Sequence, residues 1–254
     1  MNLMGGFGAA FAASGAAASQ DKRTQFYNAW FFNLKNGTQP ARVHEYLKNG
    51  MLPALARAGA GPAVVLEALV APHMPQVAML FGCSSFDDLW NIHSKVTQDD
   101  EHHKQMALVE QGDEPPFETE QVMLLQAAPF SPELVVDKEP RKTPRVFELR
   151  VYHSPTWRQL RALHERFAGP EIQIFHRSGV NPVLYSSTII GPNMPNLTYL
   201  IPFENLDARE KAWAKFGADP EWVKVRKESV DKYGQISSVI QISLYKATAY
   251  SPVG

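Results

Sequence analysis

The chain has 254 residues, of which 44% are hydrophobic, 11% aromatic and 20% charged, and its formal net charge is −1. This composition supplies enough apolar side chains for a folded core and excludes an intrinsically disordered chain. The single cysteine, Cys83, excludes a disulfide scaffold, and the near-neutral charge argues against a nucleic-acid-binding protein, which is usually basic.

The first predicted element is an uncharged tail. Residues 1–20 contain seven alanines and four glycines, a stretch too short and too glycine-rich for a transmembrane segment. The tail resembles the apolar region of a secretory signal peptide with Ala16-Ala17-Ala18 as the candidate cleavage motif, but it lacks the basic start of such a signal. Two interpretations stay open: residues 1–25 are a signal-like segment of an exported protein, periplasmic or secreted, or a disordered tail of a cytoplasmic one.

The rest of the chain is an internal duplication. Residues 26–132 align with residues 146–252 without a gap at a shift of 120 residues, and 20 of the 107 positions are identical. This is about three times the roughly 6% expected by chance. The chain therefore divides into the tail 1–25, a first unit 26–132, a linker 133–145 and a second unit 146–254.

The second unit shows the predicted elements most clearly. Alternating apolar and polar side chains predict strands, apolar side chains at helical spacing predict helices, and Gly or Pro marks the ends. In chain order the elements are a strand at 146–153, a helix at 156–178 interrupted at Gly169-Pro170 and closed by Gly179, strands at 183–190 and 196–202, a helix at 205–233 broken near Gly217 and Pro220, and a strand at 239–247.

This order, βαββαβ, occurs in both units and predicts an α+β protein of two tandem ferredoxin-like repeats, each an antiparallel sheet with both helices on one face. The other face of the first sheet would carry Trp30, Phe32, Met123 and Leu125. Because exposed apolar area is unfavourable by about 25 cal/mol per Å², we expect the two sheets to face each other and close a barrel-like cavity.

The two units also differ in charge. Residues 26–132 carry a net charge of −6 and residues 146–252 a net charge of +3. Opposite charge on two halves of one chain suggests that the halves, or two copies of the chain, dock on each other. A homo-oligomer is therefore one predicted assembly.

Several stretches of the second unit resemble the NIPSNAP family. They are the run Glu171–Gly179, the stretch Ile190–Tyr199, Ala212-Trp213 with Asp219–Trp222, and Phe147–Tyr152. The resemblance is weaker across residues 26–132, a layout similar to bacterial proteins with two NIPSNAP units. It implies the dimeric α/β-barrel superfamily, whose members include cofactor-free monooxygenases, isomerases and haem-binding enzymes, and it implies no catalytic residue.

The candidate ligand-binding residues of the second unit are mostly polar side chains that we expect inside the barrel. Glu148, Arg150 and Tyr152 share one face of the first strand, and Tyr185 lies on the second. If they converge, they supply donors, acceptors and an acid–base pair in an apolar pocket. The alternative is a buried salt bridge, Glu148–Arg150, that only neutralises charge.

Other candidates lie on the predicted helices. His44-Glu45 and His164-Glu165 begin like a zinc-protease motif, but Lys48 and Ala168 replace its second histidine, so no metal site is predicted. We interpret His164 as a buried, hydrogen-bonded histidine and Arg57 and Arg177 as cations at helix ends. His176 beside Arg177 is a weaker candidate for anion binding, His102-His103 lie on a predicted solvated face, and Trp213 and Trp222 are predicted packing residues.

Three hypotheses about function follow. The first is a small-molecule-binding or scaffolding protein without catalysis and without a cofactor. The second is a cofactor-free monooxygenase or isomerase acting on a small, partly apolar substrate at Glu148, Arg150 and Tyr152. The third is haem binding, which requires His164 or His176 to reach the cavity as an axial ligand.

Overall fold

The computed structural model describes residues 23–137 and 141–254. The signal-like segment predicted at residues 1–20 lies outside the described residues. Among the described residues no helix is long and apolar enough to cross a membrane.

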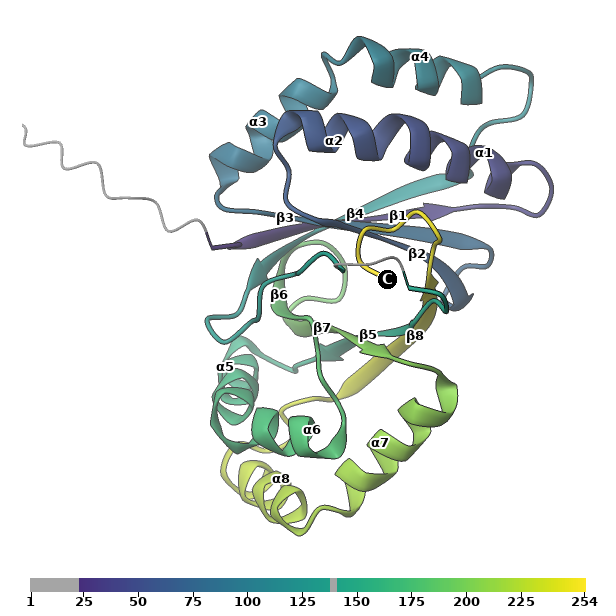
Figure 1. The fold of residues 1–254 in the computed structure, drawn as a ribbon. Helices are drawn as coiled ribbons and strands as arrows, with labels where there is room; N and C mark the ends of the chain where they lie inside the picture. The colour runs from purple at the N-terminus through teal and green to yellow at the C-terminus, as the bar shows by residue number, and fades with distance from the viewer. Residues whose placement is uncertain (1–22, 138–140) are drawn as a thin grey trace, which may run out of the picture.

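Strands and helices alternate in the same order in both halves of the chain (Figure 1). The first half consists of β1 (Phe26–Asn33), α1 (Gln39–Tyr46), the π-helical turn η1 (Leu47–Met51), α2 (Leu52–Ala58), β2 (Ala63–Val70), β3 (Gln76–Cys83), α3 (Phe86–Val96), α4 (Asp100–Val109) and β4 (Thr119–Ala127). The second half consists of β5 (Val146–His153), α5 (Trp157–Arg166), the π-helical turn η2 (Phe167–Glu171), α6 (Ile172–Ser178), β6 (Leu184–Ile190), β7 (Asn196–Phe203), α7 (Leu206–Ala218), α8 (Pro220–Tyr233) and β8 (Val239–Ala247).

The predicted elements of the second half agree with these bounds to within a residue or two at their outer ends, and the predicted interruptions lie where the helices divide. Gly169 leaves helical geometry inside η2, and Asp219 separates α7 from α8 as the N-cap of α8. Gly59 and Gly179, 120 residues apart, both end a helix with φ of 90°, a conformation that glycine adopts without steric cost.

The eight strands form one closed antiparallel barrel in the order β1-β3-β2-β8-β5-β7-β6-β4. The halves are joined by β2 with β8 and by β4 with β6. The predicted α+β barrel is therefore confirmed. Closure also removes the free strand edges that a separate half-sheet would expose.

The interior of the barrel is packed with apolar side chains from both halves rather than open. Tyr27, Phe31, Met123, Phe147 and Tyr245 belong to this core, and the remaining cavity measures about 30 Å³. A space of this size holds about one water molecule. The predicted binding cavity inside the barrel is therefore wrong, because the facing side chains fill it.

The assignment of strand faces also needs correction. Phe147 and Leu149 point into the barrel core, whereas Glu148, Arg150 and Tyr152 lie on the opposite face, beneath the helices of the second half. Trp30 and Phe32 likewise pack toward the helices of the first half. Both faces of these strands are covered by packed side chains. The alternation of side chains along a strand therefore separates its two faces, but it does not indicate which face lies inside the barrel.

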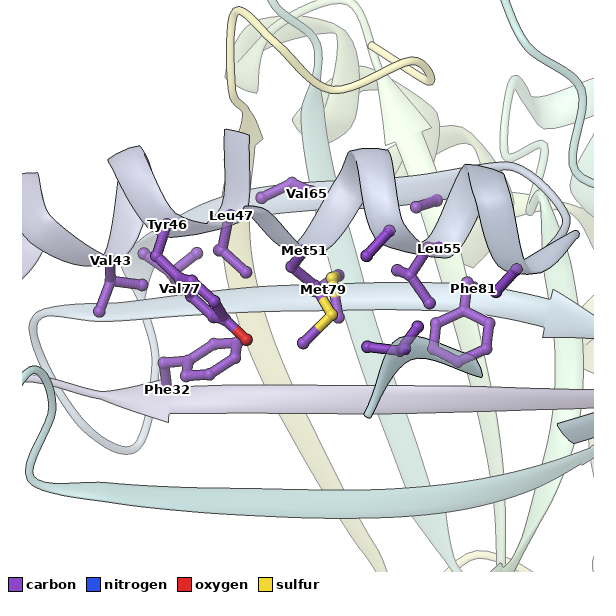
Figure 2. Close-up of a cluster of buried hydrophobic side chains, with 14 of the residues drawn as sticks. Phe32, Val43, Tyr46, Leu47, Met51, Leu55, Val65, Val77, Met79 and Phe81 are labelled. Carbon is purple, nitrogen blue, oxygen red and sulfur yellow. The ribbon is translucent and has the colours of Figure 1, made fainter. Parts of the chain in front are cut away.

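Helices cover the outside of the barrel in two separate layers, α1–α4 over the first half and α5–α8 over the second (Figure 1). Under the first layer, Tyr46, Met51 and Leu55 point from the helices toward Met79 and Phe81 of β3 (Figure 2). A separate aromatic-rich core lies under the second layer. Each half thus has its own core between sheet and helices, in addition to the shared barrel interior.

The charge difference between the halves contributes little to their contact. Among the ion pairs of the described residues, only Lys246 Nζ to Glu67 Oε2, at 3.3 Å, joins residues 26–132 to residues 146–252. Both side chains are about half exposed, and exposed pairs of this kind contribute little to stability. The two strand pairings between the halves and the apolar packing inside the barrel therefore hold the halves together.

Candidate functional site

A buried carboxylate organises the space between sheet and helices in the second half. Glu148 on β5 is fully buried. Its carboxylate accepts hydrogen bonds from Arg150 Nε at 2.5 Å, from Arg209 Nε at 2.6 Å and from Trp213 Nε1 at 2.9 Å. Two arginines and an indole therefore satisfy this acid, as a buried charge requires.

The predicted neighbours of Glu148 join the same network. Arg150 also donates to the Tyr152 hydroxyl at 3.0 Å, and its guanidinium lies 3.6 Å from the centre of the Trp213 ring, a cation–π contact. The Tyr185 ring stacks on Tyr199 at 5.8 Å, and Tyr199 packs edge-on against Tyr152. The structure thus brings Glu148, Arg150, Tyr152 and Tyr185 together in a packed cluster of charged and aromatic side chains.

The other predicted residues lie elsewhere. His164 on α5 is within hydrogen-bond distance of Ser187 Oγ at 2.7 Å, in agreement with a satisfied helix histidine, and burial lowers its pKa. His176 is exposed. Arg177 forms ion pairs with Asp219 at 2.8 Å and Glu221 at 2.7 Å, so it links the end of α6 to the start of α8.

A second buried ion pair was not predicted. Glu171, at the end of η2, is almost completely buried and accepts a hydrogen bond from Arg166 Nε at 2.6 Å. Burial raises the pKa of Glu171 to about 7, against the opposing effect of Arg166. The only sequence signal near Glu171 was the predicted interruption of the helix at Gly169-Pro170. This interruption lies in the π-helical turn η2, and such turns often occur at functional or strained segments.

The larger cavity between sheet and helices lies in the first half, and we call it the first-half pocket. Its volume is about 230 Å³. The lining side chains come from β1, β3 and β4, from all four helices, from η1 and from two loops; they are Trp30, Tyr46, Met51, Leu55, Met79, Phe81, Ile92, His93, Val96, Thr97, His102, Met106, Phe117 and Glu120. An apolar wall with a few polar groups is the usual composition of a small-molecule site.

The nitrogen atoms of three rings, those of Trp30, His93 and His102, add polar groups to this pocket, whose lining also includes Glu120. The Asn28 amide nitrogen donates to His93 Nε2 at 2.8 Å. The Tyr46 hydroxyl lies 2.7 Å from His102 Nε2. Trp30 Nε1 and His102 Nδ1 are buried and have no hydrogen-bond partner within the described part of the chain. Burial lowers the pKa of both His93 and His102, which favours the neutral imidazole at pH 7.

His102 therefore corrects a prediction. The sequence placed His102 and His103 on a solvated helix face, but the His102 side chain is 8% exposed and packs on Tyr46. The acidic and basic neighbours in the sequence are exposed, and α4 turns one histidine inward between them. The polar residues around His102 therefore gave no sign that its side chain is buried. The burial follows from the packing of α4 on α1 and η1.

The corresponding space in the second half is smaller because larger side chains occupy it. Leu55, Met79 and Val96 of the first half correspond to Phe175, Tyr199 and Phe216 at a shift of 120 residues, and these three aromatic rings pack together. A cavity of about 110 Å³ remains between β5, β8 and α8, lined partly by Tyr152, Arg166 and Trp222. These differences were readable from the alignment of the two halves at this shift, although their consequence depends on the packing.

Metal binding finds no support in the described residues, where no three His, Cys, Asp or Glu side chains converge in a metal-binding arrangement. His102 and Asp99 are close in sequence, but Asp99 caps α4 and pairs with Arg57 at 2.7 Å. These groups are therefore engaged in the structure of the helix end.

Comparison with protein families gives one match. Residues 147–252 match the model of the NIPSNAP family, so the predicted resemblance is confirmed for this part of the chain. No curated protein matches the chain at a significant level. A NIPSNAP family protein of unknown function from Agrobacterium tumefaciens is 21% identical, with a TM-score of 0.40, and the match covers 45% of this chain and 97% of that chain.

Solved structures with the same fold cover most of the chain. A "putative monooxygenase" from Lactobacillus acidophilus is 10% identical with a TM-score of 0.54, over 89% of this chain and 94% of that chain. An anthrone oxidase-like protein is 10% identical with a TM-score of 0.55, over 89% of this chain and 92% of that chain. These similarities show a shared overall fold, and a shared fold does not determine function.

Proposed function

Because residues 147–252 form a NIPSNAP domain, a family of unknown function, we propose a function from the geometry of the site: the chain binds a small, largely apolar molecule in the first-half pocket. The observation that carries this proposal is the cavity of about 230 Å³ between β1, β3 and the helices. An apolar protein cavity of about 150 Å³ is large enough to bind benzene. A ligand with one or two aromatic rings therefore matches the available space.

The difference between the two halves supports this choice of site. The second half holds Glu148 in a network of two arginines and a tryptophan, and aromatic rings occupy the space next to it. The first half keeps smaller side chains at the matching positions. A protein that needed only packing at these positions would have no reason to leave the larger cavity in one half.

The proposal includes the origin of the two halves as tandem ferredoxin-like repeats at residues 26–132 and 146–254, with residues 133–145 as the linker. Supporting observations are the two π-helical turns, Leu47–Met51 and Phe167–Glu171, and the strands β3 and β7, each pair 120 residues apart. Arg57 with Asp99 and Arg177 with Asp219 repeat the same ion pair. The repeats would then have diverged into a binding half and a structural half.

Filling the pocket tests the proposal. Met79→Tyr introduces the residue that the second half has at Tyr199, and it is expected to occupy the cavity. Indane, a small apolar bicyclic compound, serves as the probe in thermal denaturation. At about ten times its dissociation constant it is expected to raise the melting temperature of the wild-type protein by about 3 °C and to have no effect on Met79→Tyr.

Val70→Tyr is the matched control, because Val70 is 58% exposed on β2 and outside the pocket lining. This variant is expected to respond to indane like the wild-type protein. An equal response of all three proteins would place indane elsewhere on the molecule and contradict the proposed site, as would the lack of any response in the wild-type protein.

A cofactor-free monooxygenase or isomerase is the second candidate, now at the first-half pocket rather than at Glu148. The observation in its favour is a pair of neutral histidines, His93 and His102, beside an apolar cavity. The names of the two structural neighbours, a monooxygenase and an oxidase-like protein, agree with it. Consumption of oxygen in the presence of a bound aromatic substrate and its loss in His93→Leu would distinguish catalysis from binding.

The geometry offers less to haem. His164 bonds to Ser187 and His176 is exposed, and neither lines the first-half pocket. The cavity of about 230 Å³ is also smaller than the roughly 300–1,000 Å³ of pockets for larger ligands. The residues predicted as axial ligands therefore do not fit this group.

A further inference from the structure

Two buried nitrogen atoms of residues that line the first-half pocket, Trp30 Nε1 and His102 Nδ1, have no hydrogen-bond partner within the described residues. An indole nitrogen only donates. The Asn28 amide nitrogen also only donates, so His93 Nε2 must accept, and the proton of the neutral ring lies on Nδ1.

The same reasoning assigns the proton of His102. The Tyr46 hydroxyl has no other acceptor within the described residues than His102 Nε2, so it donates to that nitrogen. Burial raises the pKa of Tyr46, which keeps the hydroxyl protonated. The proton of the neutral His102 ring is therefore on Nδ1, and this N–H is one of two buried donors in the pocket lining that have no partner within the described residues.

The second half shows what the first half lacks. There the donors Arg150, Arg209 and Trp213 converge on the carboxylate of Glu148. The residue that corresponds to Glu148 in the first half is Asn28, whose amide nitrogen is bound to His93. At this position the first half thus has an amide in place of the acid. The pocket lining includes one carboxylate, Glu120 on β4, but Trp30 Nε1 and His102 Nδ1 have no partner within the described residues, and an unpaired buried donor is unfavourable.

We propose that the ligand of the first-half pocket is a small aromatic molecule that carries an acceptor oxygen, a ketone, quinone or phenolate, and that Trp30 Nε1–H and His102 Nδ1–H donate to this oxygen. This inference rests on the proposed function. Neutral donors suit a carbonyl or a delocalised oxyanion better than a localised carboxylate, for which arginine is the usual partner.

Access to the two N–H groups requires movement of the lining. Neither nitrogen is open to solvent, so the oxygen reaches them only after a neighbouring side chain shifts. Met51, Met79 and Met106 line the pocket, and methionine is the most adaptable apolar side chain. The second half has Glu171, Tyr199 and Arg226 at these positions, two of which are fixed in ion-pair or aromatic contacts.

Indane and indanone form a matched pair of probes, because they differ only in one carbonyl oxygen. Their dissociation constants are measured by calorimetry for the wild-type protein and for Trp30→Phe, which removes the N–H and keeps an aromatic ring. The affinity ratio of indanone to indane is expected to fall about tenfold in Trp30→Phe. Trp157→Phe, at an exposed tryptophan on α5, is the control and is expected to keep the ratio.

A second measurement needs no change in the pocket. In nitrogen-15 NMR spectra the indole N–H signal of Trp30, assigned by its loss in Trp30→Phe, is expected to move clearly further downfield with indanone than with indane, because a new hydrogen bond deshields the N–H proton. Equal movement with both probes and an unchanged affinity ratio in Trp30→Phe would overturn the inference, while binding of indane that Met79→Tyr abolishes would leave the proposed function intact. If neither probe binds the wild-type protein, the proposed function and the inference both fail.

Discussion

Glu148→Gln is expected to lower the free energy of unfolding by about 3–5 kcal/mol, because it removes the buried counter-charge shared by Arg150 and Arg209, of which only Arg209 keeps another carboxylate, Glu210. The Glu148 carboxylate is fully buried, and Arg150 and Arg209 are 11% and 14% exposed. Their attraction to Glu148 offsets the cost of removing all three charges from water. Urea denaturation of the two proteins measures the difference.

The first half suggests a control for this prediction. At the corresponding positions of the first half, 120 residues earlier, the chain has the uncharged residues Asn28, Trp30 and Leu89. The triple variant Glu148→Asn, Arg150→Trp, Arg209→Leu copies these three residues. It is expected to lose less stability than Glu148→Gln, because no buried charge remains unpaired. Glu204→Gln, at an exposed pair with Arg141, should change stability by about 1 kcal/mol or less. A similarly small loss in Glu148→Gln would contradict the role assigned to the carboxylate.

Glu171 is expected to make the protein less stable as the pH rises from about 4.5 to about 7. Its pKa is raised from 4.5 to about 7 by burial, so the folded state holds the proton more tightly than the unfolded state does. The stabilising contribution of the protonated form is complete below the unfolded pKa and is lost as pH rises through the folded pKa. The difference between these pKa values corresponds to about 3 kcal/mol.

Comparison with Glu171→Gln isolates this effect from other titrating groups. The free energy of unfolding of the wild-type protein minus that of the variant should fall by about 3 kcal/mol across this pH range and then level off. Glu165→Gln removes an exposed carboxylate from the preceding helix and should keep the wild-type fall, since Glu171 remains. A constant difference between wild type and Glu171→Gln would show that Arg166 keeps Glu171 ionised throughout.

Much of the architecture was predictable because local signals agree with the global fold. Three local signals in the second half each predicted one feature of the fold. Alternating side chains predicted the strand at residues 146–153, Gly169-Pro170 predicted the interruption of the helix, and Gly179 predicted its left-handed end. Some of these signals recur 120 residues apart, as at Gly59 and Gly179, and the uncovered faces of two half-sheets then require closure. Backbone geometry and apolar periodicity depend on residues near each other in sequence, so the chain alone carries this information.

The site was not predictable in the same way. The sequence identified Glu148, Arg150 and Tyr152 as sharing a face, but the position of that face under α7 depends on Arg209 and Trp213, about 60 residues away. The inward turn of His102 depends on the docking of α4, and the first-half pocket depends on the summed volumes of side chains from ten segments. The sequence by itself therefore determined the order of elements and the closed α+β barrel that they form. The tertiary structure decided which face is inside and where space remains, because burial on both faces and packing volume are properties of distant residues together.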